Sequence, residues 1–277
     1  MNNSAKLLVV HADDLGMTHS VNAASTKAIE SGLVPSASVM VPCPWFPEIA
    51  DWAKAHPEAD LGVHLTVTSE RPYFRWAPVA SRNKVGSLVD VNGYFHGNWE
   101  QSMRIDPKEV ERELCEQIDR ALAMGIRPTH LDSHQNRLLT SGKRIFRSLR
   151  RAAREYKLPL VLIRNWFGAH PHLGENAEPS DIIVDRSVTI DAGTPAENWA
   201  GFYTAALRNL QPGVTEFVIH LGFDDEEMRA ATRDRDSWGA AWRQRDFDFF
   251  TSQEFKRLLD EYGVKLVTCR ELPRAAG

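Results

Sequence analysis

A regular alternation of short apolar runs with longer helical patterns most constrains how this chain folds. The first apolar run, LLVVHAD at residues 7–13, precedes a helical pattern over 20–32. The next run, SASVMV at 36–41, precedes a helical pattern over 46–59. Further runs of this kind, separated by helical patterns, recur to the end of the chain. This order is typical of βαβ units and predicts an α/β fold with a parallel sheet.

The number of strands favours a barrel over an open sheet, although the sequence does not prove closure. A (β/α) barrel commonly uses about 250 residues, and the chain has 277. Neither an internal repeat nor a low-complexity tract divides it. We therefore expect a single-domain, irregular (β/α) barrel over residues 1–277, with seven or eight parallel strands.

Two long segments interrupt the alternation. Residues 70–105 carry six aromatic side chains, and residues 224–246 are highly charged and include Trp238 and Trp242. Long excursions of this kind are usually functional. We expect them to be binding loops, with a lid that does not contact substrate as the alternative.

Ionisable residues recur where predicted strands end. Asp13 and Asp14 follow the first apolar run, His64 lies in LGVHLTV, His134 ends THLDSH and His220 lies in EFVIHLG. The carboxyl ends of parallel barrel strands converge on one face, where such enzymes carry their active sites. These side chains are therefore expected to form one functional site.

The motif THLDSH indicates metal binding. His130, Asp132 and His134 are spaced by two, which places them on one face of a strand. Imidazoles together with a carboxylate commonly bind a divalent metal. His134 is expected to act directly, and His130 and Asp132 either as ligands or as groups that orient a ligand. The remaining histidines are expected to be structural: His11, His19, His56, His170 and His172.

Composition and motifs argue against several other classes of protein. The formal net charge of −4 gives no reason to expect a nucleic-acid or membrane partner. The basic run at residues 143–157 carries an apolar stripe and is expected to be the solvated face of a barrel helix. Glycine-rich phosphate loops and the GxSxG elbow of serine hydrolases are absent from the sequence.

The compartment expected from the sequence is the cytoplasm. The apolar run before His11 has only four residues, too few for a signal peptide core or a membrane span. Three widely spaced cysteines, Cys43, Cys115 and Cys269, suit buried or free thiols better than a disulfide framework or a cysteine zinc site.

The motifs ADDLG (12–16), GVHLT (62–66) and PTHLDSHQN (128–136) resemble those of the YdjC/ChbG-type carbohydrate deacetylases. The resemblance extends to EFVIHLGF (216–223) and WRQRDFDFFTS (242–252). It implies a distorted (β/α) barrel that removes N-acetyl groups from amino sugars with the help of a metal.

By motif position, the resemblance implies metal ligands at Asp14, His64 and His134. It implies that Asp13 is the catalytic base and His220 a further catalytic or substrate-polarising group. Gly16 is expected to permit a bend that turns both aspartates towards one pocket. The further residues expected to bind substrate or support the site are His130, Asp132, Arg164, Tyr94, Phe95, Trp99, Trp238, Arg243 and Asp246.

The chain also departs from the family pattern. Gln135 to Leu138 replace a histidine-rich continuation, Leu221 replaces a proline, and Asp246 replaces a glutamate. These departures affect the identity of the substrate more than the ligand set.

The expected function is metal-dependent hydrolysis of an N-acetyl group on an amino sugar or short oligosaccharide, with acetate release. The expected cofactor is one divalent cation, with zinc or magnesium foremost and manganese, cobalt or nickel as further options. The alternatives are another metal-dependent barrel enzyme, such as a sugar isomerase or phosphoesterase, and a non-catalytic carbohydrate-binding barrel. The expected partner is a small carbohydrate, and a homodimer is compatible with the sequence.

Overall fold

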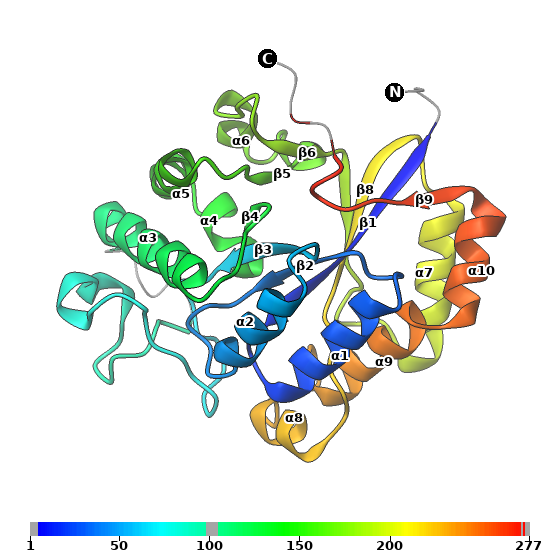
Figure 1. Ribbon diagram of the computed structural model, residues 1–277, viewed down its shortest axis with the longest axis horizontal. Helices are drawn as coiled ribbons and strands as arrows, with labels where there is room; N and C mark the ends of the chain where they lie inside the picture. Colours follow the sequence, from blue (N-terminus) through cyan, green and yellow to red (C-terminus); the bar gives the residue numbers. More distant parts are fainter. Residues whose placement is uncertain (1–4, 98–104, 273, 275–277) are drawn as a thin grey trace.

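A parallel sheet around strand β1 organises the fold (Figure 1). The computed structural model describes residues 5–97, 105–272 and 274. The main sheet has seven strands in the order β4-β3-β2-β1-β8-β7, with β9 also paired to β1. Its strands are β1 (Lys6–Leu15), β2 (Ser36–Val39), β3 (Asp60–Leu65), β4 (Leu131–Ser133), β7 (Arg186–Val188), β8 (Gly213–Ile219) and β9 (Val264–Leu266).

The sheet curls but does not close. All of its paired strands are parallel, which confirms the α/β fold with a parallel sheet. Strands β5 (Val161–Ile163) and β6 (Ile182–Val184) form a separate parallel pair. A single isolated bridge, Leu131 to Leu160, joins this pair to β4. These strands have only three residues each, and the ladder stops there. The described residues form a half-barrel, which is consistent with an irregular (β/α) barrel but is not closed.

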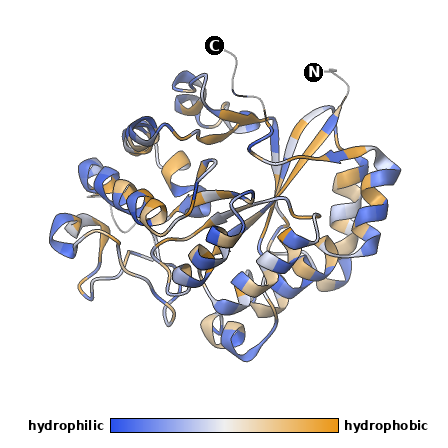
Figure 2. Cartoon of the chain, in the orientation of Figure 1, coloured by the Kyte–Doolittle hydropathy of each residue, from blue (hydrophilic) through white to orange (hydrophobic). Residues whose placement is uncertain are grey.

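Helices cover the outside of the curled sheet (Figure 1). Figure 2 shows apolar residues along the central strands and hydrophilic residues on the outward faces of the helices. The α-helices are α1 (His19–Glu30), α2 (Phe46–Ala55), α3 (Pro107–Ala123), α4 (Arg137–Thr140), α5 (Lys143–Tyr156), α6 (Pro171–Glu175), α7 (Trp199–Arg208), α8 (Glu226–Ala231), α9 (Ala240–Phe250) and α10 (Gln253–Tyr262). Short 3₁₀ turns are η1 (Arg82–Lys84), η2 (Gly86–Leu88), η4 (His134–Asn136), η5 (Arg164–Trp166) and η6 (Ala196–Asn198). Within the described residues, the helices are too short or too polar to cross a membrane.

The described parts of the two excursions, residues 70–97 with 105 and residues 224–246, are folded and contact each other. The first contains η1, η2 and an antiparallel bridge between Val89 and Phe95. The second contains α8 and the start of α9. Arg71 joins them: its Nη1 donates to Asp234 Oδ1 at 2.9 Å and its Nη2 to the Trp238 carbonyl at 3.0 Å. This buried arginine fixes one excursion against the other.

Glu113 on α3 anchors the first excursion. Its buried carboxylate accepts hydrogen bonds from the backbone N–H groups of Val79 and Ala80, both at 2.9 Å, and from Gln117. Burial raises the pKa of Glu113 from 4.5 to about 7, although those donors oppose the rise. Because the folded pKa exceeds the unfolded one, the stabilisation is complete below about pH 4.5 and is lost as the pH rises through 7.

This linkage predicts a pH-dependent stability. We expect a lower free energy of unfolding at pH 8 than at pH 5, with Glu113 contributing at most about 3 kcal/mol of the difference. Glu113→Gln should flatten the dependence measured by urea denaturation, whereas Glu58→Gln, at an exposed position, should leave it unchanged. An unaltered slope in Glu113→Gln would exclude this role.

Candidate metal centre

Strand β1 delivers two adjacent carboxylates to the same pocket. An irregularity in its pairing with β2 falls between Ala12 and Leu15. Asp14 has a φ of 72°, a conformation that side chains other than glycine adopt at a cost of about 1–3 kcal/mol. Gly16 follows with a φ of 92°. The bend predicted at Gly16 therefore begins two residues earlier, at Asp14, which is why Asp13 and Asp14 both reach the pocket.

Three buried ligand atoms converge at the end of the sheet. Asp14 Oδ1 lies 3.7 Å from His64 Nε2 and 3.3 Å from His134 Nδ1. The two histidine nitrogens lie 3.3 Å apart. Ligands bound tetrahedrally at about 2.1 Å from a cation lie about 3.4 Å from one another. The triangle therefore has the size that a small divalent cation requires.

Hydrogen bonds direct both histidine lone pairs into this triangle. His64 Nδ1 donates to Asp132 Oδ1 at 2.9 Å, which leaves Nε2 free to accept a cation. His134 Nε2 donates to Glu70 Oε2 at 3.2 Å, which leaves Nδ1 free. Such carboxylate–histidine pairs support metal ligands in proteins.

Asp14 is prepared in the same way. Its Oδ2 accepts a hydrogen bond from Arg243 Nη2 at 2.6 Å, whereas Oδ1 is buried and makes no hydrogen bond within the described residues. Burial alone would raise the pKa of Asp14, but Arg243 and His134 hold it well below its usual range. An ionised carboxylate with one unsatisfied buried oxygen fits a cation, so the residues present match the expected metal.

Asp13 and His220 lie beside the triangle without belonging to it. Asp13 Oδ2 is 3.7 Å from His64 Nε2 and 3.9 Å from His220 Nε2. Burial raises the pKa of Asp13 to about 6 and lowers that of His220 to about 3. The backbone N–H of His220 donates to Asp246 Oδ2 at 3.0 Å. Asp246 Oδ1 accepts from Trp199 and Tyr203, so Asp246 holds the His220 backbone in place.

A cavity of about 680 Å³ opens over these groups. This volume suits a small molecule or one or two sugar rings. Its lining comes from the strand ends and from both excursions. The lining residues are Asp13, Asp14, Glu70, Arg71, His134, Gln135, Asn136, Arg137, Trp166, Ser187, Val188, Thr189, Val218, His220, Arg235, Trp238 and Arg243.

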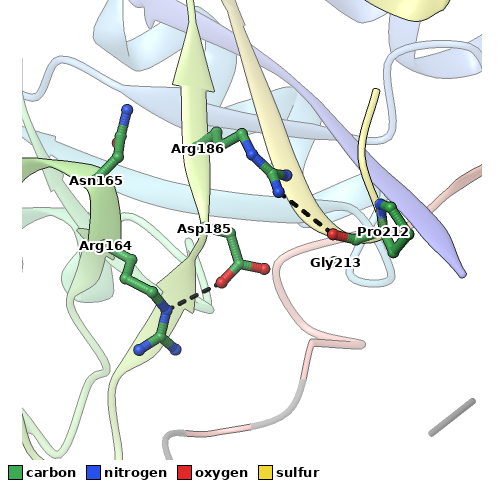
Figure 3. Close-up of a pocket in the computed structure, with 6 residues that line it drawn as sticks. All are labelled: Arg164, Asn165, Asp185, Arg186, Pro212 and Gly213. Carbon is green, nitrogen blue, oxygen red and sulfur yellow. Dashed lines mark hydrogen bonds and ion pairs between the residues drawn. The ribbon is translucent and has the colours of Figure 1, made fainter. Parts of the chain in front are cut away.

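Several predicted residues lie elsewhere. Arg164 is paired with Asp185 at 3.0 Å in a separate, shallow pocket with Arg186 (Figure 3). Its neighbour Trp166, not Arg164, lines the cavity at the metal centre, because the chain turns into η5 directly after β5. The geometry therefore does not support a substrate-orienting role for Arg164.

The predicted aromatic contacts are mostly absent from the cavity. Trp238 lines it. Tyr94 is 39% exposed, lies under the Arg75 guanidinium and is not part of the lining, and Phe95 is buried in the core. Trp99 lies outside the described residues.

His130 occupies a deeper level than the other two residues of its motif. His11 contacts both Asp132 (3.1 Å) and the His130 ring (centroids 5.2 Å apart), so His130 and Asp132 share the inner face of the sheet as the spacing predicted. His134 lies beyond them, at the start of η4. Asp132 therefore supports His64, whereas His130 does not contribute to the triangle.

Two residues that support the candidate metal centre, His11 and Glu70, are not predicted to do so from the sequence. His11 was assigned a structural role, but its Nε2 lies 3.4 Å from Asp13 Oδ1 as well as beside Asp132. His11 and Asp13 are two residues apart in β1, so their side chains lie on the same face of the strand, and this spacing could have indicated the contact. From the sequence, Glu70 is recognised only as the first residue of a long excursion. Its contact with His134 is distant in sequence and leaves no local pattern.

The support that Asp132 gives to His64 predicts a change in metal affinity. Asp132→Asn should weaken divalent-metal binding by roughly 10- to 100-fold, because the amide holds the His64 ring less well and lowers its basicity. Titration of the metal-free protein followed by calorimetry measures this. Asp185→Asn, whose carboxylate pairs with Arg164 outside the cavity, is the control expected to bind metal normally. Equal affinities in both variants would contradict the assignment.

Fold and site together define a class: an α/β protein with a buried Asp–His–His cluster at the carboxyl ends of parallel strands. Residues 7–261 match the family model described as YdjC-like protein. A carbohydrate deacetylase of Geobacillus stearothermophilus is 34% identical over 268 residues, covering 95% of this chain and 96% of the relative. A carbohydrate deacetylase of Enterococcus faecalis is 30% identical over 285 residues, covering 97% and 99%. The chain belongs to the YdjC-like family, which confirms the resemblance of its motifs.

A solved structure supports the same fold. A protein of Enterococcus faecalis V583, provisionally described as a cellobiose-phosphate cleavage protein, superposes with a TM-score of 0.79. It is 28% identical, and the match covers 96% of this chain and 98% of that one.

Proposed function

We propose that the protein is a metal-dependent hydrolase that removes an N-acetyl group from an amino sugar or short oligosaccharide. The observation that carries the proposal is the triangle of Asp14 Oδ1, His64 Nε2 and His134 Nδ1, with Asp13 and His220 beside it. Relatives at 30–34% identity that are named carbohydrate deacetylases support the same reaction.

Asp13 lies where it can activate a water molecule at the metal centre. A divalent cation held by Asp14, His64 and His134 supplies Lewis acidity towards water and the amide carbonyl. Asp13 accepts the proton of the attacking water as a general base. Its carboxylate fits this role because its Oδ2 lies 3.7 Å from His64 Nε2, one of the proposed ligand atoms. Asp13 is therefore close to the metal centre without being one of its three proposed ligands.

His220 acts on the substrate amide itself rather than on the attacking water. Its ring faces Asp13 at 3.9 Å and lines the cavity. From this position the neutral imidazole donates a hydrogen bond to the carbonyl oxygen as charge develops on it. It protonates the departing amine only after taking up a proton during the reaction. Asp246 acts as a positioning residue, because it fixes the His220 backbone rather than touching the substrate.

The cavity wall offers groups for a sugar. Trp238 presents an aromatic surface, and Gln135 and Asn136 follow His134 directly, both with φ values of 54°. This left-handed pair turns the chain away from β4 and brings two amide side chains to the rim. Because these residues replace the histidine-rich continuation of the family pattern, we propose that they contribute to the choice of sugar.

Acetate release tests the proposed function. The purified protein, loaded in turn with zinc, magnesium, manganese, cobalt or nickel, is incubated with N-acetylated mono- and oligosaccharides. The expected result is stoichiometric acetate and free amine from at least one sugar. Absence of acetate across the whole panel would contradict the proposal.

A second candidate is cleavage of a sugar phosphate, favoured by the provisional description of the Enterococcus faecalis V583 structure. The same metal triangle could serve phosphoester hydrolysis. Phosphate release from phosphorylated disaccharides, measured in the same panel, separates the two reactions.

A further inference from the structure

A second cluster of potential metal ligands lies in the interior, apart from the candidate metal centre. His11 on β1, His130 before β4 and Cys269 after β9 each place one ligand atom within 4.8 Å of the others. All three side chains are at most 1% exposed. His130 and Cys269 have no role in the proposed reaction, and His11 reaches that site only through Asp13 and Asp132, so the convergence of the three needs another explanation.

The hydrogen bonds of His130 leave one ring nitrogen without a partner. Thr129 Oγ1 lies 3.3 Å from the Leu61 carbonyl, to which it donates. It therefore accepts from His130 Nδ1 at 2.9 Å. The opposite nitrogen, Nε2, then carries a lone pair and is buried without a hydrogen bond within the described residues. A Cβ atom at Gly62 would come within 2.3 Å of Nε2, so only glycine leaves it room.

The same reasoning applies to His11. Its Nε2 lies 3.1 Å from Asp132 Oδ2 and donates to it. Its Nδ1 lies 3.1 Å from Ser36 Oγ, but that hydroxyl donates its proton to Asp60 Oδ2 at 2.7 Å. The Ser36 hydroxyl therefore does not donate a proton to the Nδ1 lone pair of a neutral His11.

Nearby carboxylates supply negative charge for a cation. Asp60 Oδ2 also accepts the backbone N–H of Cys269 at 2.7 Å, and Asp60 Oδ1 is buried without a hydrogen bond in the described part of the chain. Buried charges that lack a counter-charge are costly. A bound cation would offset both this carboxylate and the thiolate that Cys269 becomes on binding it.

We propose that His11, His130 and Cys269 form a second, buried metal site, distinct from the Asp14–His64–His134 centre. Two imidazoles and a thiolate are among the donors of structural zinc sites. Zinc binding displaces the thiol proton, which passes to solvent. The site ties β1, the approach to β4 and the segment after β9 together and so stabilises the sheet.

Metal content and cobalt spectroscopy test this site independently of catalysis. The wild-type protein is expected to bind two equivalents of zinc, whereas Cys269→Ser and His134→Ala bind one each. With cobalt in place of zinc, a thiolate-to-cobalt charge-transfer band should appear in the near ultraviolet. Cys269→Ser should lose the band, and His134→Ala should keep it, since the Asp14 centre contains no sulfur.

Cys43→Ser is the matched control, because Cys43 is also a buried thiol but lies outside the cluster. It should keep both equivalents and the band. One equivalent and no charge-transfer band in the wild-type protein would overturn the proposal and would show that the cluster holds a proton, as an imidazolium–thiolate pair, instead of a metal. The wild-type spectrum decides this even if Cys269→Ser fails to fold.

Discussion

Replacing His134 with alanine is expected to remove one equivalent of bound metal and to reduce deacetylation by on the order of 10³-fold or more. His134 Nδ1 lies 3.3 Å from both Asp14 Oδ1 and His64 Nε2, so its loss leaves only two ligands. The Lewis acidity of the cation is worth several kcal/mol to the transition state, and about 4 kcal/mol corresponds to that factor. Metal analysis and acetate release on the same sample measure both effects.

The control for His134→Ala is His19→Ala. His19 is exposed and pairs with Glu48 on the protein surface. This variant should retain metal and activity. Full metal content together with normal activity in His134→Ala would show that His134 is not a metal ligand. The triangle of Asp14, His64 and His134 would then not be the catalytic metal site.

The second large effect is expected from Asp13→Asn, which should keep its metal while acetate release falls by about 10²- to 10⁴-fold. Asparagine preserves the shape of the side chain but cannot accept the proton of the attacking water. Asp13 is outside the ligand triangle, so the affinity for the cation should change little.

Comparing Asp13→Asn with His134→Ala separates base catalysis from metal binding. Asp13→Asn should lose activity but keep its bound metal. His134→Ala should lose both activity and metal. If Asp13→Asn lost its metal to the same extent, Asp13 would be a ligand rather than the base. If it kept normal activity, another group would be the base.

The parallel arrangement of the strands and the convergence of Asp14 and His64 were predictable because both follow from local patterns. Apolar runs alternating with helices require parallel strands, and the carboxyl ends of such strands meet at one edge. The proximity of His64 and Asp14 could therefore be predicted from the sequence. Closure could not be predicted, because it depends on the ladder between β4 and β5, which reduces to one bridge, Leu131 to Leu160.

The groups that support the ligands were harder to predict because they are distant in sequence. Arg243 and Asp14 are 229 residues apart, and Glu70 and His134 are 64 apart. Such pairs leave no periodic pattern; Arg243 was found only through the resemblance of its motif to the family. The spacing of THLDSH predicted one strand face for all three residues, which holds for His130 and Asp132. The strand ends at Ser133 and His134 begins η4, so His130 and His134 fall in different clusters.

The Asp132→Asn and Glu113→Gln variants test parts of the structure that the two larger predictions leave aside. The first concerns the orientation of a ligand, and the second concerns the attachment of the first excursion to α3. Their effects should be independent, because the two side chains share no partner.

Acetate release before and after metal removal tests the central claim most directly. The protein is treated with a chelator, assayed on the sugar identified in the panel, and assayed again after a divalent cation is returned. The account predicts that release disappears on chelation and returns with the cation in the wild-type protein but not in His134→Ala. Undiminished acetate release from the metal-free wild-type protein would contradict it.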